Sequence, residues 1–188
     1  MVPETPPEDR GDGLQPEGAG WFVMNARDAR WFDAPGRHSL PLTGYDEFEA
    51  ENYFPMLGMA LRVLEPGTPM SSYHWETEAE DFLVLGGTPL LIVEGQERML
   101  KQWDFVHCPP EAKHVFVGAG DGPSLILATS SRQFQKDGPW GFYVKDDVAA
   151  KHGASPSETS QDDSRDFPAS QPSRYREGWL ERPFGSVG

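Results

Sequence analysis

The sequence predicts an all-β domain, a small sandwich or barrel, on three observations. Glycine and proline are abundant, with 20 Gly and 18 Pro in 188 residues, which is a turn-rich composition. From residue 56 to residue 131 the chain consists of short apolar runs ended by Gly, Pro or Asp, such as DFLVLGG, PLLIVEG and SLILATSS. No stretch of this region keeps the 3.6-residue periodicity of an amphipathic helix. Strand-length runs separated by turn residues are typical of all-β folds.

The chain divides into a leader, a barrel and a C-terminal arm. Residues 1–19 are rich in Pro, Glu, Asp and Gly without periodicity, which predicts a disordered leader. Residues 20–145 are expected to form the barrel, with an N-terminal strand extension and a core over 56–131. Residues 146–188 should hold a short helix that ends at Gly153 and then an extended arm. The aromatic residues near the C-terminus, in RYREGWLERPF, predict that this arm packs on the barrel or on a second subunit.

Charge and cysteine content exclude several classes of partner. The formal net charge is -14, from 30 acidic and 16 basic residues, so the surface should repel nucleic acid and anionic membranes. The chain has no apolar run of about 18 residues, and its acidic, proline-rich start lacks the features of a signal peptide. The single cysteine, Cys108, cannot form an internal disulfide. We therefore expect a cytoplasmic protein without a nucleic-acid or membrane partner.

The residues that can bind a metal occur close together in the sequence. His74 and Glu76 are two positions apart, so on a strand both side chains point to one face. Glu80 follows at the start of the next apolar run, and His114 comes just after a Pro-Pro turn. Two imidazoles and one or two carboxylates, without a thiolate, suit a divalent first-row metal ion such as Mn, Fe, Ni or Zn. The sequence therefore predicts one metal site, although these residues could also be unrelated surface positions on ordinary strands.

The same region resembles the two motifs of the cupin family over roughly residues 56 to 130. The first cupin motif reads G-x5-H-x-H-x3-4-E-x6-G, and the second reads G-x5-P-x-G-x2-H-x3-N. The matching positions of this chain are Gly67, His74, Glu80 and Gly87 in the first motif, and Pro109 and His114 in the second. Either motif alone is a weak signal, but here both occur in the expected order and spacing.

The chain also departs from these motifs. Glu76 replaces the second histidine of the first motif, which has one extra residue near its start. In the second motif, Trp103 replaces the opening glycine, Glu111 replaces the glycine of the turn, and Gly118 replaces the asparagine. The first of these changes bears on the ligand set, and the others bear on the turns.

The resemblance implies a fold and a metal site. The fold is a small double-stranded β-helix, or jelly-roll barrel, here with extended N- and C-terminal arms. One divalent ion in its mouth would be held by His74, Glu80 and His114. Glu76 would be either a fourth ligand or a solvent-facing acid beside Glu78. Cupin resemblance also implies a homodimer.

The interior of the barrel can be predicted from strand alternation. Alternation over residues 57–64 places Leu57, Met59, Leu61 and Val63 inside and Arg62 outside. The expected walls of the cavity are Phe82, Val84, Phe105 and Phe116. These residues predict an apolar cavity around the metal, suited to a small aromatic or enolised molecule. His107 is a candidate proton carrier in this cavity or, equally, a core histidine with its hydrogen bonds satisfied.

These expectations favour a metal-dependent enzyme that acts on a small organic molecule. A dioxygenase is the leading interpretation, and isomerase or decarboxylase chemistry is also possible, because an open metal site supports all three. Two other classes remain open. The chain could be a non-catalytic cupin that binds a small ligand or sugar, or an assembly module whose arm clasps a partner and whose site is vestigial.

Overall fold

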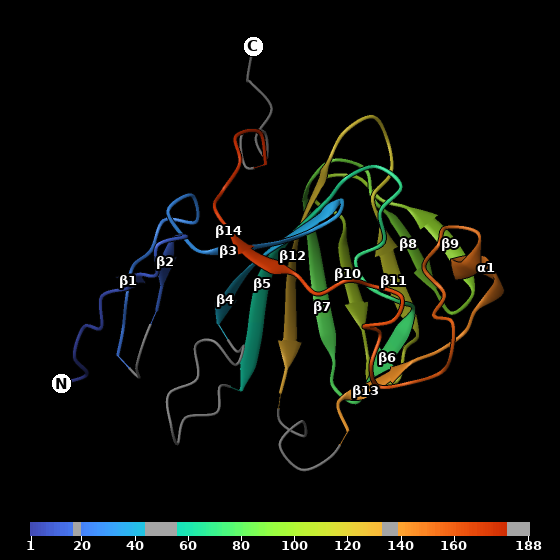
Figure 1. Cartoon of the computed structure of the whole chain (residues 1–188). Helices are drawn as coiled ribbons and strands as arrows, with labels where there is room; N and C mark the ends of the chain where they lie inside the picture. The colour runs from blue at the N-terminus through green and yellow to red at the C-terminus, as the bar shows by residue number, and fades with distance from the viewer. Residues whose placement is uncertain (17–19, 44–55, 133–138, 180–188) are drawn as a thin grey trace.

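The fold is all-β, as predicted, and consists of two large antiparallel sheets and one small one (Figure 1). The computed structural model describes residues 1–16, 20–43, 56–132 and 139–179. The first large sheet has seven strands in the order β10-β7-β12-β5-β4-β3-β14, and the second has five in the order β13-β6-β11-β8-β9. The strands of the first are β3 (Trp31–Ala34), β4 (Arg37–Thr43), β5 (Leu57–Leu64), β7 (Glu80–Gly86), β10 (Phe105–Cys108), β12 (Ser124–Ser131) and β14 (Gln171–Ser173). Those of the second are β6 (His74–Glu76), β8 (Leu90–Val93), β9 (Gln96–Met99), β11 (His114–Val117) and β13 (Gly141–Tyr143).

The two large sheets pack face to face around one apolar core. This core joins side chains from both sheets, namely Leu64, Phe82, Leu91, Cys108, Phe116 and Ile126. All six are at most 4% exposed, and burial of this kind stabilises a sheet by roughly 1.5–3 kcal/mol per large apolar side chain. The metal-ligand candidates lie at the open end of the same interior, at the starts of β6, β7 and β11.

The other face of the seven-stranded sheet is covered over β3, β4 and β5. Trp31 of β3, Val63 of β5 and Trp179 of the C-terminal arm share a second buried cluster there. Trp179 stacks on His38 at 4.2 Å between ring centroids and lies 5.0 Å from Trp31. Strand β14 pairs with β3 of the same chain and crosses the sheet in Figure 1. The described part of the arm therefore packs on its own barrel.

This second cluster explains why the alternation predicted for β5 is wrong. Leu61 and Val63 pack on the outer face of the sheet, under the N-terminal strands and the arm. The even-numbered residues Gly58, Arg62 and Leu64 line the interior cavity instead. Because apolar residues fill both faces of β5, alternation alone could not tell the inner face from the outer one.

The predicted leader is partly ordered. Within it, β1 (Glu8–Asp9) pairs with β2 (Leu14–Gln15), and Leu14 bridges to Ala29 in the segment before β3. Nη1 of Arg30 donates a hydrogen bond to the side chain of Gln15 at 2.9 Å. The expectation of disorder over residues 1–19 is therefore wrong for this hairpin. Polar contacts hold it against the domain, and such contacts leave no hydrophobic periodicity in the sequence.

The short helix is present as predicted. Helix α1 (Asp147–Ala150) begins after Asp146, whose carboxylate accepts hydrogen bonds from the backbone N–H groups of Val148 and Ala149. The turn that follows ends at Gly153, which has a φ of 66°. Within the described residues, no helix has the length and apolar character needed to span a membrane.

Two departures from the motifs fall where the backbone is left-handed. The motif glycines Gly67 and Gly87 have φ values of 77° and 76°. Trp103 and Glu111, which stand where the second motif has glycine, have φ values of 74° and 69°. The chain therefore keeps the backbone shape of these turns although a side chain costs roughly 1–2 kcal/mol there.

Candidate metal centre

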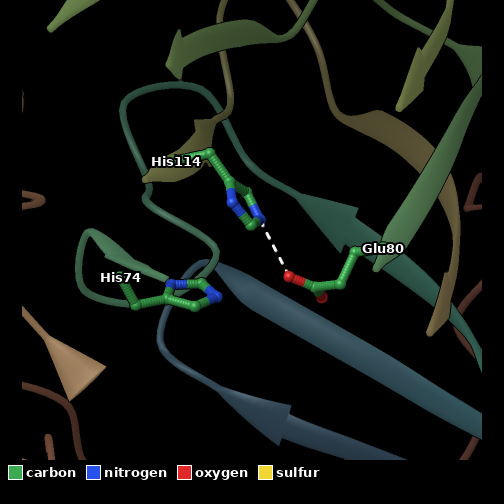
Figure 2. A group of neighbouring side chains, drawn as sticks. All are labelled: His74, Glu80 and His114. Atoms are coloured by element: carbon green, nitrogen blue, oxygen red, sulfur yellow. Dashed lines mark ion pairs between the residues drawn. The ribbon is translucent and has the colours of Figure 1, made fainter. Parts of the chain in front are cut away.

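Three strand starts bring the predicted ligands together. His74 begins β6, Glu80 begins β7 and His114 begins β11. His74 and His114 are partners in the register of β6 and β11, and their ring centroids are 4.8 Å apart. Figure 2 shows the three side chains pointing toward one another. One potential ligand atom from each residue lies within 4.8 Å of the others. Residues 40 positions apart in sequence thus share one site, as the sequence predicted.

Backbone contacts orient both imidazoles. Nδ1 of His74 lies 2.7 Å from the carbonyl oxygen of Ser72, and Nδ1 of His114 lies 3.0 Å from that of Ala112. A carbonyl oxygen can only accept a hydrogen bond, so each Nδ1 carries the proton in the neutral ring. The lone pair is then on Nε2 in both rings, and the Nε2 of His114 faces Glu80. Metal-binding histidines are held by the same kind of contact.

The site is buried, and burial sets its protonation. His74 is 9% exposed and His114 is 2% exposed. Burial lowers the pKa of His74 to about 4, so this ring is neutral at pH 7. Burial also lowers the pKa of His114, but the Cys108 thiol and the Glu80 carboxylate outweigh it and raise this pKa well above its usual value. His114 is therefore protonated in the metal-free protein, and a metal would replace that proton.

The acidic side chains of the site are placed to accept a cation. Nε2 of His114 lies 3.1 Å from Oε2 of Glu80, an ion-pair contact in which the proton of His114 occupies the place of a metal ion. Within the described part of the chain, Oε2 of Glu76 is buried without a hydrogen-bond partner. A buried oxygen left in this way is costly, and a cation would satisfy it. The residues present therefore fit a divalent ion on His74, Glu80 and His114.

Glu76 lies beside this triad. It lines the same cavity, and burial, followed by the charge of Glu80, raises its pKa to about 8. Of the two roles left open for Glu76, a solvent-facing acid is thus wrong, while ligation stays a prediction. Its neighbour Glu78 is 3% exposed and accepts a hydrogen bond from Oγ of Ser131 at 2.7 Å, so it has a structural role.

His107 does not lie in the cavity, and its candidacy as a proton carrier there is corrected. Its side chain is 55% exposed, and Nδ1 lies 2.6 Å from Oδ1 of Asp81 on the neighbouring strand β7. Phe105, two residues earlier on β10, is 63% exposed. Residues two apart on a strand share a face, so both belong to the outer face of the sheet. Cys108, on the opposite face, is buried.

The cavity above the triad has a volume of about 320 Å³, and it is more polar than predicted. Phe82 and Phe116 contribute the expected apolar wall. Three arginines, Arg37, Arg62 and Arg132, line the same space. The prediction of an apolar cavity is therefore wrong. It follows from a strand alternation that puts Arg62 on the outer face, and it does not consider Arg37 or Arg132 as lining residues.

Other lining residues come from segments after residue 139. The ring of Trp140 lies 6.1 Å from that of His74, and the ring of Tyr143 lies 5.6 Å from it. Burial raises the pKa of Tyr143, so its phenol keeps its proton at neutral pH. Asp163 and Ser170 reach the cavity from the arm. Sequence reasoning missed these residues; only the aromatic run GPWGFYV gave a signal for them, as a strand.

Comparison with known families agrees with this geometry. The family model for the cupin domain, Cupin_2, matches residues 60–130. Residues 60–130 are a cupin domain. The two sheets and the ligand-bearing strand starts described above all belong to this domain or adjoin it. The resemblance seen in the two motifs is thereby confirmed. Among curated proteins, none matches the chain.

Several solved cupin structures are similar to the chain over about half of its length. A sugar phosphate isomerase from the cupin superfamily of Silicibacter pomeroyi is 28% identical over 53% of this chain and 61% of its own, with a TM-score of 0.46. A Cupin 2 conserved barrel domain protein from Salinispora arenicola is 21% identical over 54% of this chain and 80% of its own, with a TM-score of 0.44. A protein of the same description from Rhodopseudomonas palustris is 16% identical over 50% of this chain and 60% of its own, with a TM-score of 0.42. At these TM-scores, the likenesses carry nothing about activity.

Proposed function

We propose that this cupin is an enzyme that uses one divalent first-row metal ion to transform a small organic molecule. The observation that carries the proposal is the triad itself. One ring nitrogen from each of His74 and His114 and one carboxylate oxygen of Glu80 lie within 4.8 Å of one another on the wall of a cavity. Three protein ligands leave positions open on a six-coordinate metal, which is the arrangement of catalytic rather than structural sites.

The donor set favours oxygen-dependent chemistry. Two histidines and one carboxylate with open positions form the ligand set of many non-haem iron oxygenases. A bound ion of this kind would polarise a substrate oxygen and bring the substrate together with dioxygen. We therefore propose a dioxygenase as the leading reaction, with isomerase or decarboxylase chemistry as the alternative that the same ligands support.

The chain's own side chains would prepare the substrate for this chemistry. Phe82 and Phe116 exclude water from one side of the triad. Tyr143 holds its proton and presents a neutral donor beside His74. Arg62 lies close enough to Glu80 and His74 to lower the pKa of each. These groups bind, orient and shield a small molecule next to the triad.

Metal analysis is the first test of this proposal. Purified wild-type protein should contain close to one equivalent of a divalent metal, and His114→Ala should lose most of it. His107→Ala is the matched control, since His107 also faces a carboxylate but on the exposed outer face. Less than about a tenth of an equivalent in the wild type, or equal loss in both variants, would sink the metal hypothesis.

Turnover then separates the reaction classes. Metal-loaded protein is incubated with a panel of small organic acids and enols while dioxygen uptake and product are followed. Uptake that requires both substrate and metal supports a dioxygenase. Product without dioxygen uptake supports isomerase or decarboxylase chemistry. Stabilisation by a compound that is never converted would mean that the domain is a binder rather than an enzyme.

A further inference from the structure

The cavity contains several positively charged side chains that are not metal ligands. Arg37, Arg62 and Arg132 line it together with three carboxylates, those of Glu76, Glu80 and Asp163. The cavity thus has as many arginines as acidic side chains, and a divalent ion would give it a surplus of positive charge. The chain as a whole has a formal net charge of -14, so this surplus stands out against an acidic surface. A positive, partly dry cavity favours an anionic ligand.

Two of these arginines lie near the acidic ligands. Arg62 and Arg132 line the same cavity wall as Glu76 and Glu80. Their charges therefore offset the carboxylates that face the metal site. Arg37 differs from them, because the carboxylate that acts on it most strongly is Asp163 of the C-terminal arm.

The guanidinium of Arg37 is held in place by backbone and by one ring. Nη2 donates a hydrogen bond to the carbonyl oxygen of Pro168 at 3.0 Å, and Nη1 donates one to that of Met70 at 3.3 Å. Its central carbon lies 4.5 Å from the ring centroid of Phe167. Two segments, the loop before β6 and the arm, thus hold the forked guanidinium group in one orientation. A guanidinium has five N–H donors, so these two bonds leave donors for a ligand in the cavity.

We propose that Arg37 binds the anionic group of the substrate, a carboxylate or a phosphate, while the rest of the molecule reaches the triad. A planar fork that is already oriented loses little freedom when it forms paired hydrogen bonds with such a group. The C-terminal arm is then part of the binding site, since it supplies Phe167 and the carbonyl of Pro168. This inference names the substrate class of the proposed enzyme and rests on that proposal only for the reaction, not for the binding of the anion.

The test uses two simple anions, inorganic phosphate and malonate, titrated into the full-length protein by calorimetry and thermal shift. Both are measured with metal-free and metal-loaded protein, and metal content is determined in every sample. Arg37→Gln should weaken anion binding at least tenfold while it keeps its metal. Arg37→Lys should recover only part of the affinity, because it keeps the charge and loses the fork. Whichever anion binds more tightly to the wild type identifies the group.

The controls separate this inference from the proposed function. Arg98→Gln removes an exposed arginine on β9 and should leave anion binding unchanged. Phe167→Ala should weaken binding about threefold, since it loosens the guanidinium and keeps the charge. His114→Ala should lose the metal but still bind the anion in the metal-free state, so a failure of the metal hypothesis would not remove this result. Wild-type affinity in Arg37→Gln, equal weakening in Arg98→Gln, or no anion binding by the wild type would overturn the inference.

Discussion

The substitution Glu80→Gln tests whether the buried carboxylate serves a metal or only the fold. The new amide has almost the same shape, but it is a poor metal ligand. In the metal-free variant, the amide does not face an unpaired charge, because buried His114 can release its proton and accept a hydrogen bond from the amide on Nε2. Nδ1 of His114 still donates to the carbonyl of Ala112. We therefore expect the metal-free variant to unfold within about 1 kcal/mol of the metal-free wild type.

Metal should separate the two proteins. A ligand at 100 times its dissociation constant stabilises the folded state by about 2.7 kcal/mol. For a chain of 188 residues, each kcal/mol shifts the midpoint of thermal unfolding by roughly 2–4 °C. Saturating metal should thus raise the wild-type midpoint by about 5–11 °C, whereas the Glu80→Gln variant should gain much less.

The assay is thermal unfolding of both proteins with chelator and with excess Mn²⁺, Fe²⁺, Ni²⁺ or Zn²⁺ in turn. A purely structural ion pair between Glu80 and His114 gives a different pattern. The metal-free proteins would behave as above, but excess metal would change the midpoint of neither the wild type nor the variant. That pattern would refute a metal-binding role for the triad.

Four further outcomes are expected. Metal affinity should rise with pH between about 6 and 8, because the metal must displace the proton of His114, and calorimetry in two buffers should detect about one released proton. Trp179→Ala should cost about 3 kcal/mol and release the arm first, seen as early hydrogen exchange of residues 171–173. Glu111→Gly should stabilise the fold by about 0.5–1 kcal/mol in denaturant titration, since it relieves a φ of 69°. Gly141→Ala should weaken the pairing of β13 with β6, because its Cβ would overlap the carbonyl oxygen of Trp75; circular dichroism and unfolding would report the loss.

The site could be predicted from sequence where local rules decide the geometry. His74 and Glu76 share a face because they are two apart on one strand, and both line the cavity. His114 follows a turn whose proline and left-handed position recur in the motif, and this turn aims the start of β11 at β6. In each case the information lies within a few residues of the ligand. The long-range meeting of the strands could be predicted only from the cupin resemblance.

The wrong predictions concern tertiary structure that local patterns do not contain. Alternation places Arg62 outside because Leu61 and Val63 look like the inner face, yet both pack under Trp31 and the arm. The position of His107 on the strand that leads to His114 favours a place near the cavity, but β10 lies at one end of the seven-stranded sheet, where its outer face is open to solvent. Asp163 and Phe167 stand in a polar, low-complexity stretch without periodicity, so nothing in the sequence indicates that this stretch returns to the cavity.

Charges in the cavity explain how the site can exist before a metal arrives. In the metal-free protein the proton on His114 pairs with Glu80 at the position of the metal, so folding should not depend on metal as it does in a zinc finger. A divalent ion replaces that single proton and therefore adds positive charge to the cavity. An anion held at Arg37 offsets part of this charge, and each ligand should therefore bind more tightly when the other is present. The charges thus make the binding of metal and the binding of substrate cooperative, although Arg37 itself is not one of the metal ligands.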